Sequence, residues 1–345
     1  MTTPIRIGLL RLVDSAPVVV ADALGFFADL GLEVELSVEP SWANTMDKLG
    51  YGLLDAAVML PPLALAAALG LRGPKVDLIV PMGLTQGGNA IVVGAGIDPI
   101  PGQDVVGWLQ AHPEPPRFGV VHRFSTHNLL LRYWLALGGA DPDRDIETVV
   151  VPPEQMVAAL RDGRVTGFCA GAPWGDVAQA AGVGRVVLGT SSIWPFHPEK
   201  CLAVHGGWAA ANAESLHLLI AALLRAQLVC DSASDAPEVA RMLADPNLLA
   251  LPEAESRSAL PGGNGVERIH FHAAGAWLPA IPHALWFLRE MRRWGWIADT
   301  VDLPAVARAV YRPDILVKVL GAEGLGPRQE ASTSGLRASL TEMAV

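Results

Sequence analysis

The chain has 345 residues, which is long for one compact core and predicts two lobes. Hydrophobic residues make up 51% of the sequence and charged residues 17%, so a disordered chain is excluded and there is enough apolar material for buried sheets. The formal net charge of −10 argues against a nucleic-acid-binding surface, although a small pocket can still be positive locally and bind an anion.

The first ninety residues alternate predicted strands and helices. Residues 5–10 fit a first strand, and Asp14 or Ser15 is the cap candidate for a helix that has Pro17 in its first turn. The further elements expected here are strands at 33–38, 53–60 and 76–82 and a short helix beginning near Ala43. This βα rhythm predicts an α/β fold with a largely parallel sheet flanked by helices.

No export signal is recognised ahead of the first strand. Met1 to Pro4 lead directly into that strand, whereas a secretory signal needs a basic start, an apolar run and a small-residue cleavage site. We therefore expect a cytoplasmic protein. The apolar stretch Leu53–Leu71 does not predict a membrane span, because Asp55 and the Pro61–Pro62 pair divide it into a strand and a separate helix.

A second βα block is predicted after the first, with the Pro- and Gly-rich segment 94–102 as the crossing into it. Its expected elements are strands at 118–121, 147–151, 165–170 and 185–188 and helices that begin near Thr126, Pro153 and Pro173. Cys201–Val204 is predicted to be the return strand of this block. Gly206–Gly207 then opens a mainly helical remainder.

Together these elements predict two βα lobes joined by two hinge crossings, with a ligand cleft between the lobes. The expected division places residues 1–92 and 206–326 in lobe 1, residues 93–205 in lobe 2 and residues 327–345 in a flexible tail. Four tryptophans of the helical remainder either pack internally or contribute to a partner interface: Trp277, Trp286, Trp294 and Trp296.

The three cysteines, Cys169, Cys201 and Cys230, form no CxxC pattern. They predict neither a disulfide framework nor a zinc site, and small buried thiols are the expected outcome. No cofactor loop or metal motif is found, so we expect neither a cofactor nor a metal.

Two basic side chains are candidates for holding an anion. His127 follows Ser125 and Thr126, either of which can cap a helix, and it then lies in the first turn, where free N–H groups favour negative charge. Lys200 stands at the entrance to an apolar strand, and its ammonium is a point charge on a flexible stem. The alternatives are a capping or surface histidine and a solvated lysine at a strand end.

Two further donors are candidates for the same ion. Trp42 follows the second predicted strand, and its indole N–H donates but cannot accept, which suits an ion that offers only acceptors. Asn89 follows two glycines, and its amide can donate as well. Core packing for the tryptophan and an ordinary turn for the asparagine are the alternatives.

A series of motifs resembles a known family over roughly residues 5 to 300. The chain resembles the nitrate/bicarbonate-binding protein family of ABC transport systems, and this resemblance implies a type II periplasmic-binding-protein fold. The matching stretches are Asp14–Pro17, Gly25–Phe27, Ser41–Trp42 with Thr45 and Asp47, Thr126–Leu129, Leu131–Leu135, Val151–Pro153, Gln155–Val157, Gly167–Cys169, Pro173–Trp174 and His197–Lys200.

The resemblance implies a nitrate or nitrite site and assigns residues to it. Nitrate binders hold the ion with side chains that match Trp42, His127 and Lys200, and with the backbone N–H that here belongs to Ala43. A glutamine of the family is replaced by Asn89, which shortens one donor arm. A second departure is Ala172, which stands where relatives often have a glutamate, so that a local charge is missing.

The expected mechanism is closure of the lobes around the ion. Trp42 and Asn89 are expected to come from lobe 1, and His127 and Lys200 from lobe 2 or its return hinge. Nitrate is planar and accepts hydrogen bonds only, so a cation with imidazole, amide and indole donors suits it. The ion would bridge the lobes and favour the closed form.

Without an export signal, the resemblance is nearest to the NasS-type cytoplasmic nitrate/nitrite sensor. The resemblance implies a partner, a NasT-like antiterminator with an ANTAR RNA-binding domain. The sensor holds this partner inactive in the absence of the ion and releases it when nitrate or nitrite binds. We expect this protein itself to contact neither nucleic acid nor a membrane. Three alternatives remain: the binding subunit of a nitrate transporter, a bicarbonate-binding variant, and an enzyme on the same fold that resembles thiamin-precursor synthases. The enzyme would need an acid–base pair built from residues such as His127, Cys169 or His205.

Overall fold

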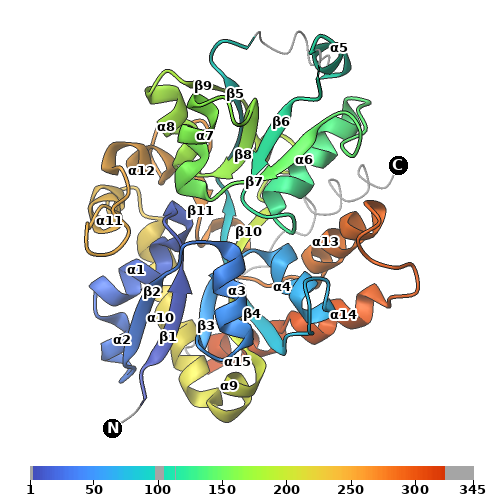
Figure 1. Cartoon of the computed structure of the whole chain (residues 1–345). Helices are drawn as coiled ribbons and strands as arrows, with labels where there is room; N and C mark the ends of the chain where they lie inside the picture. The colour runs from blue at the N-terminus through green and yellow to red at the C-terminus, as the bar shows by residue number, and fades with distance from the viewer. Residues whose placement is uncertain (1–2, 98–104, 113, 323–345) are drawn as a thin grey trace.

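The computed structural model describes residues 3–97, 105–112 and 114–322. The predicted tail at 327–345 and residues 98–102 of the predicted crossing lie outside the described residues. Two β-sheets carry the fold, one in each half of the molecule, and helices cover them (Figure 1). The predicted α/β class with two βα lobes is therefore confirmed.

The first sheet has the strand order β11-β4-β10-β3-β1-β2, and the second has the order β7-β6-β8-β5-β9. The strands of the first sheet are β1 (Ile5–Leu9), β2 (Val34–Val38), β3 (Ala56–Met59), β4 (Leu78–Gly87), β10 (Pro198–His205) and β11 (Ile269–His270). Those of the second are β5 (Asn89–Gly94), β6 (Arg117–Val120), β7 (Glu147–Val150), β8 (Gly167–Gly171) and β9 (Gly184–Gly189). Below, lobe 1 and lobe 2 mean the parts of the chain around the first and the second sheet.

Each sheet is mixed, and five of the nine strand pairs among the described residues are antiparallel, so the prediction of a largely parallel sheet was wrong. The strand β1 is parallel to β2 and β3, and β6 is parallel to β7 and β8. The strand β10 is antiparallel to β3 and β4, and β5 is antiparallel to β8 and β9. The strand β11 is antiparallel to β4 as well. The strands β5 and β10 are those that follow the crossings between the sheets, where the chain enters the neighbouring sheet in the reverse direction.

The crossings lie elsewhere than predicted. The strand β5 already pairs in the second sheet, so the first crossing is at Gly88, between β4 and β5, and not at 94–102. The strand β10 pairs in the first sheet, so Cys201–Val204 belongs to lobe 1 and not to lobe 2. The second crossing is therefore the segment between β9 and β10, which includes the short helix η4 (Thr190–Ser192).

Helices follow the strands as the sequence pattern indicates. The helices that bear on the site are α1 (Ala16–Ala23), α3 (Trp42–Gly50), α6 (Thr126–Leu137) and α8 (Trp174–Ala180), with the short helix η1 (Val13–Ser15) before α1. The others are α2 (Phe26–Asp29), α4 (Pro61–Leu69), α5 (Val105–Gln110), η3 (Pro153–Gln155), α7 (Met156–Arg161), α9 (Gly206–Ala211), α10 (Ala213–Cys230), α11 (Ala236–Leu243), α12 (Glu253–Ala259), η5 (Ala273–Gly275), α13 (Ile281–Arg293), α14 (Leu303–Val310) and α15 (Pro313–Ala322).

Two apolar stretches that attract attention in the sequence are parts of the core. The stretch Leu53–Leu71 is divided into β3 and α4, as predicted. Within the described residues, α10 is the one helix long and apolar enough to cross a membrane, but 56% of it is buried and it packs on α1, α2 and α15. It therefore has the environment of a core helix. The tryptophans Trp286, Trp294 and Trp296 also pack against the main hydrophobic core.

A buried glutamine on α10 fastens the strand that leads into the first crossing. The side-chain amide of Gln227 donates to the carbonyl oxygens of Gly83 and Leu84 on β4, at 3.1 and 2.9 Å. We expect Gln227→Leu to lower the free energy of unfolding by about 2 kcal/mol, because two buried acceptors lose their donor. Urea unfolding would measure it, and a loss below about 0.5 kcal/mol would contradict this role.

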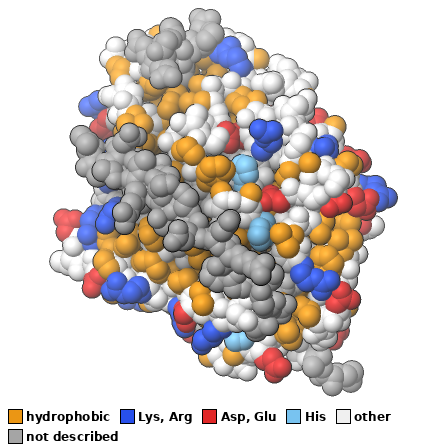
Figure 2. All heavy atoms as spheres, turned by 180° about the vertical axis from the view of Figure 1, so that it is seen from behind, with side chains coloured by type: hydrophobic (Ala, Val, Ile, Leu, Met, Phe, Trp, Pro, Cys, Tyr) orange, Lys and Arg blue, Asp and Glu red, His pale blue; other side chains and the backbone are white. Residues whose placement is uncertain are grey.

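On the face drawn in Figure 2, the described residues form no large field of one charge. Figure 2 shows lysine, arginine and acidic side chains interspersed over the face opposite to the view of Figure 1. This distribution agrees with the inference, drawn from the net charge of −10, that a nucleic-acid-binding surface is not expected.

Candidate functional site

A buried lysine on β10 is the centre of a polar cluster between the two sheets. The ammonium of Lys200 lies 3.1 Å from Oδ2 of Asp14 and 2.7 Å from Oε1 of Glu199. It also lies 5.6 Å from the centre of the Trp42 ring, within the range of a cation–π interaction. All four side chains are buried, with at most 1% of each residue exposed. A buried charge of this kind needs partners, and lobe 1 supplies them.

Lobe 2 reaches the same cluster from the other side. The amide of Asn89, the first residue of β5, donates to Oε2 of Glu199 at 2.6 Å. The ring atom Nε2 of His127, in the first turn of α6, lies 3.4 Å from Oε1 of Glu199. Four of the predicted residues, Trp42, Asn89, His127 and Lys200, are thus brought together. Asn89 was predicted in lobe 1, but it begins β5 in lobe 2, directly after the first crossing. Lys200 was expected from lobe 2 or its return hinge, and it lies on β10 of the first sheet, shortly after the second crossing.

The local sequence explains the positions of Trp42 and His127. Ser41 caps α3 by accepting from the N–H of Asn44 at 3.2 Å, and Ser125 caps α6 by accepting from the N–H of Asn128 at 3.1 Å. Both caps place the next residues in a first helical turn, where backbone N–H groups lack intrahelical acceptors. Ala43 occupies the second position of α3, and its assignment to the ligand stays a prediction.

Gly171 lies beside the space where side chains of the two lobes meet. A methyl group added to Gly171, the last residue of β8, would lie 3.1 Å from Oδ2 of Asp14, 3.4 Å from Oδ1 of Asn89 and 3.5 Å from Nε2 of His127. Side chains from both lobes therefore converge on one small volume in front of this glycine. Any larger residue at this position would fill that volume.

Several buried polar groups on the elements that form the cluster have no hydrogen-bond partner within the described part of the chain. They are the indole N–H of Trp42, the hydroxyl of Thr126, both ring nitrogens of His127, one of which carries an N–H in the neutral imidazole, and the amide oxygen of Asn89, which is an acceptor. Unpaired buried donors are costly, and proteins keep few of them without a reason. An acceptor-only group placed among these donors would satisfy them.

The protonation states follow from burial and from the neighbouring charges. Burial, with Lys200 and His197 adding to it, lowers the pKa of His127 well below its ordinary value, so the imidazole is neutral at pH 7. Burial alone would lower the pKa of Lys200, but the carboxylates of Asp14 and Glu199 outweigh it and raise that pKa. Burial raises the pKa of Glu199 to about 7, with Asp14 adding to the rise and Lys200 opposing it. The cluster therefore holds one permanent cation.

Sequence reasoning missed the acidic members of the cluster. Asp14 was interpreted as a helix cap, but it accepts from the hydroxyl of Thr85 at 3.0 Å and pairs with Lys200. Glu199 stands in the matching stretch His197–Lys200, but no role was predicted for it from the sequence. A signal was present, since both carboxylates stand in the two stretches that carry the resemblance, but a set of donors for an anion gave no reason to look for acids.

The remaining candidates for catalysis do not assemble at the cluster. The thiol of Cys169 is fully buried, and burial raises its pKa well above the ordinary value, so it would be a poor nucleophile. The ring of His205 instead caps α9, accepting from the N–H of Trp208 at 3.3 Å. In residues 3–97, 105–112 and 114–322, no group of three His, Cys, Asp or Glu side chains has the arrangement of a metal site.

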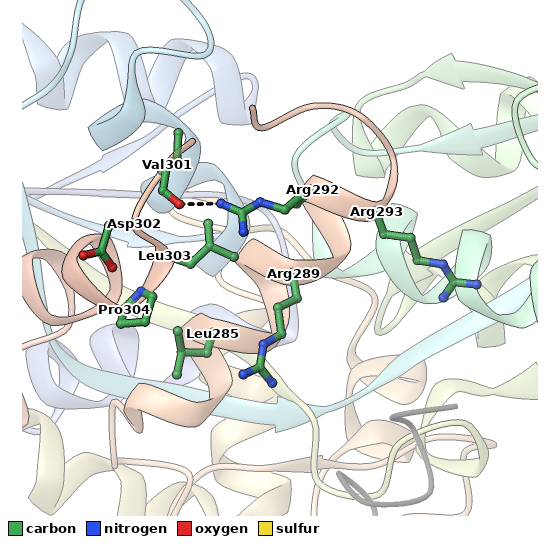
Figure 3. A pocket seen from close by; sticks show the side chains of 8 residues that line it. All are labelled: Leu285, Arg289, Arg292, Arg293, Val301, Asp302, Leu303 and Pro304. Carbon is green, nitrogen blue, oxygen red and sulfur yellow. Dashed lines mark hydrogen bonds between the residues drawn. The ribbon is translucent and has the colours of Figure 1, made fainter. Parts of the chain in front are cut away.

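A larger cavity lies elsewhere, between α13 and the start of α14. It has a volume of about 500 Å³ and is lined by Leu285, Arg289, Arg292, Arg293, Val301, Asp302, Leu303 and Pro304 (Figure 3). Arg292 donates to the carbonyl of Val301, while Arg289 and Arg293 are exposed on the helix. Because the charges of this cavity face water, it would hold a small anion weakly. We therefore place the candidate site at the enclosed cluster around Lys200.

Comparisons with known proteins identify the family and relatives that bind or transport small anions. A model of the NMT1-like family matches residues 1–244. The nitrate/nitrite binding protein NrtA of Synechocystis sp. strain PCC 6803 is 30% identical, and the match covers 91% of this chain and 75% of that protein. The bicarbonate transport ATP-binding protein CmpC of the same organism is 36% identical, with 84% of this chain covered, but the chain spans only 46% of that protein.

A solved structure is similar over almost the whole chain. The crystal structure of the periplasmic nitrate-binding protein NrtA from Synechocystis PCC 6803 superposes with a TM-score of 0.87 at 28% sequence identity. The match covers 95% of this chain and 92% of that one. The predicted type II periplasmic-binding-protein fold is thereby confirmed.

Proposed function

The chain belongs to the NMT1-like family, and on that premise we propose that it binds nitrate or nitrite between its two lobes as the substrate-binding subunit of an ABC-type import system. The observation that carries the proposal is the set of buried donors without acceptors beside the ammonium of Lys200. A planar, acceptor-only anion matches these donors in hydrogen-bonding capacity. Relatives whose names state nitrate or nitrite binding support the choice of ion.

Lobe closure is the mechanism we propose for capture. Trp42 and Lys200 come from lobe 1, and Asn89 and His127 come from lobe 2, so an ion held by both pairs stabilises the arrangement in which the lobes are together. These four residues are at most 1% exposed, so an ion from solvent can reach them only when the lobes separate. Rotation about the crossings at Gly88 and between β9 and β10 provides the opening.

Calorimetric titration of the full chain tests the proposal. We expect nitrate and nitrite to bind at one site per chain, with bicarbonate and sulfate as competitors that define the specificity. Bicarbonate is the second ion to test, because a bicarbonate-transport protein is among the relatives. A binding role also predicts that nitrate is recovered unchanged. The absence of heat with nitrate, nitrite and bicarbonate alike would contradict the proposal.

The indole N–H of Trp42 allows a sharper test. We expect Trp42→Phe to weaken nitrate binding about tenfold, because one donor is lost while the aromatic ring beside Lys200 is kept. The matched control is Trp108→Phe, since its N–H is also buried without a partner but it packs in the separate core of lobe 2. Equal affinities of Trp42→Phe and the wild type in the titration would remove Trp42 from the site.

A cytoplasmic sensor is the other candidate function. It rests on the resemblance found in the sequence, whereas the names of relatives, which state nitrate binding, a periplasmic protein and nitrate import, support the import subunit. In the sensor proposal an ANTAR-domain antiterminator prefers the open form, and nitrate releases it by selecting the closed form. Fractionation of cells that express the native gene, and a pull-down of an ANTAR-domain protein with and without nitrate, distinguish the two functions. Export of the protein would rule out the sensor.

A further inference from the structure

The charge balance of the buried cluster is unfavourable for an anion. With Asp14 and Glu199 both ionised, two negative charges surround the single positive charge of Lys200, and His127 is neutral. The cluster would then carry a net charge of −1 before any ligand arrives. A second uncompensated negative charge in a buried, weakly polarisable site is strongly disfavoured. Anion binding therefore requires that one negative charge be removed.

Glu199 is the carboxylate that contacts both lobes. Its two oxygens lie 2.7 Å from the ammonium of Lys200, 2.6 Å from the amide nitrogen of Asn89, 3.4 Å from Nε2 of His127 and 3.6 Å from Nδ1 of His197. Asp14 is the further charged group that acts on Glu199, and it repels the negative charge. The thiols Cys169 and Cys201 are near enough to be affected by Glu199, but they are neutral because burial raises their pKa values. No second cation faces it among the described residues.

Neutral Glu199 would change the site in two ways. It would leave Lys200 paired with Asp14 alone, so that the cluster becomes neutral and an incoming anion adds only one charge. Its carboxyl O–H would also become a donor at a position that touches groups of both lobes. Burial already raises the pKa of this carboxyl to about 7, so the proton is available near neutral pH.

We propose that Glu199 takes up one proton when the anion enters, so that the protein binds the anion and a proton together. The proposal rests on the proposed function and deepens it. The proton is transferred from the protonated buffer or hydronium in solvent, whose bond to that proton breaks, to one carboxylate oxygen, where an O–H bond forms. Glu199 is thus a residue that sets the affinity through its protonation and through its contacts to both lobes.

The sign of the pH dependence follows from linkage. The bound anion raises the pKa of Glu199 above its value without ligand, which is about 7. Below that pH the group is already protonated and the affinity is at its maximum. Above it the affinity falls about tenfold per pH unit, until the pH exceeds the pKa in the complex.

Calorimetry of the full chain with sodium nitrate tests the proposal. Nitrate carries no titratable proton at these pH values, so any proton taken up belongs to the protein. Titrations at pH 8 in Tris and in Hepes, which differ in ionisation enthalpy, give the number of protons bound. We expect about one proton per nitrate for the wild type, and a tenfold loss of affinity per pH unit above about pH 7.

Two variants separate proton uptake at Glu199 from uptake elsewhere. Glu199→Gln should bind nitrate without proton uptake and with an affinity that is flat between about pH 6 and pH 9. The control Glu290→Gln should keep the proton uptake, because Glu290 is a buried carboxyl of α13 whose pKa burial also raises, but it lies beside Arg293 and outside the cluster. If Glu199→Gln does not fold, the proton count and the pH series of the wild type decide alone.

The possible results of these titrations distinguish failure of this inference from failure of the proposed function. Nitrate binding to the wild type without proton uptake and with a flat affinity overturns this inference and leaves the proposed function standing. Retained proton uptake in Glu199→Gln overturns the assignment to this residue. No nitrate binding by the wild type at any pH overturns both the inference and the proposed function.

Discussion

Replacing Lys200 by methionine is expected to weaken nitrate binding by at least about 100-fold, the largest effect of any single substitution in the site. Lys200 is the only permanent cation that contacts the cluster within the described residues, and its ammonium is held by Asp14 and Glu199 at 3.1 and 2.7 Å. Methionine has a similar length and no charge, so the buried volume is kept while the attraction for the anion is lost. Calorimetric titration measures the loss.

The control for this substitution is Lys48→Met. Lys48 pairs with Glu39 at 2.8 Å in the same lobe, but its side chain is partly exposed and it lies outside the cluster. We expect this variant to bind nitrate as the wild type does. Lys200→Met with the affinity of the wild type would show that the anion binds elsewhere, and the arginine-lined cavity between α13 and α14 would be the next place to test.

Gly171→Ala is expected to weaken nitrate binding by about 100-fold while the fold is kept. The added methyl would lie 3.1 to 3.5 Å from polar atoms of Asp14, Asn89 and His127, and so would occupy the volume in which their groups converge. Overpacking of this kind costs about 1–3 kcal/mol, and here the anion would bear most of it. Titration and thermal unfolding together distinguish a blocked site from a destabilised protein.

Gly96→Ala is the matched control, because a methyl group at Gly96 meets no atom within 4 Å. It should bind nitrate normally and unfold at nearly the temperature of the wild type. If Gly171→Ala binds as tightly as the wild type, the anion does not occupy the space in front of β8. A lower unfolding temperature with unchanged affinity would lead to the same conclusion.

The sequence was sufficient to predict most strands and helices, but it was insufficient to predict the order of the strands in the sheets. The alternating patterns at 5–10 and 118–121 correspond to β1 and β6, because apolar runs bounded by turn residues are a local signal. The sheet in which β10 pairs is decided by contacts with β3 and β4, more than a hundred residues earlier in the chain. No local pattern encodes such a pairing, so Cys201–Val204 was placed in the wrong lobe.

The same limitation explains what was found and missed in the site. His127 was found because it follows a helix cap, and Trp42 because it follows a predicted strand, and both are local signals. Asp14 has a local role in the sequence as well, that of a cap before Pro17, and this obscured its contact with Lys200 across the fold. Glu199 could be understood only once both lobes were in place, since Asn89 and His127 reach it from lobe 2.

The position of the two crossings has a mechanical consequence. Gly88 immediately precedes Asn89, and the segment after β9 leads into Glu199 and Lys200, so in the proposed closure the ion would lie close to both hinge segments. A rotation about these segments would move groups near them slightly and groups at the outer rims of the lobes much farther. A second protein could thus detect one small ion through the separation of the rims, without contacting the ion itself.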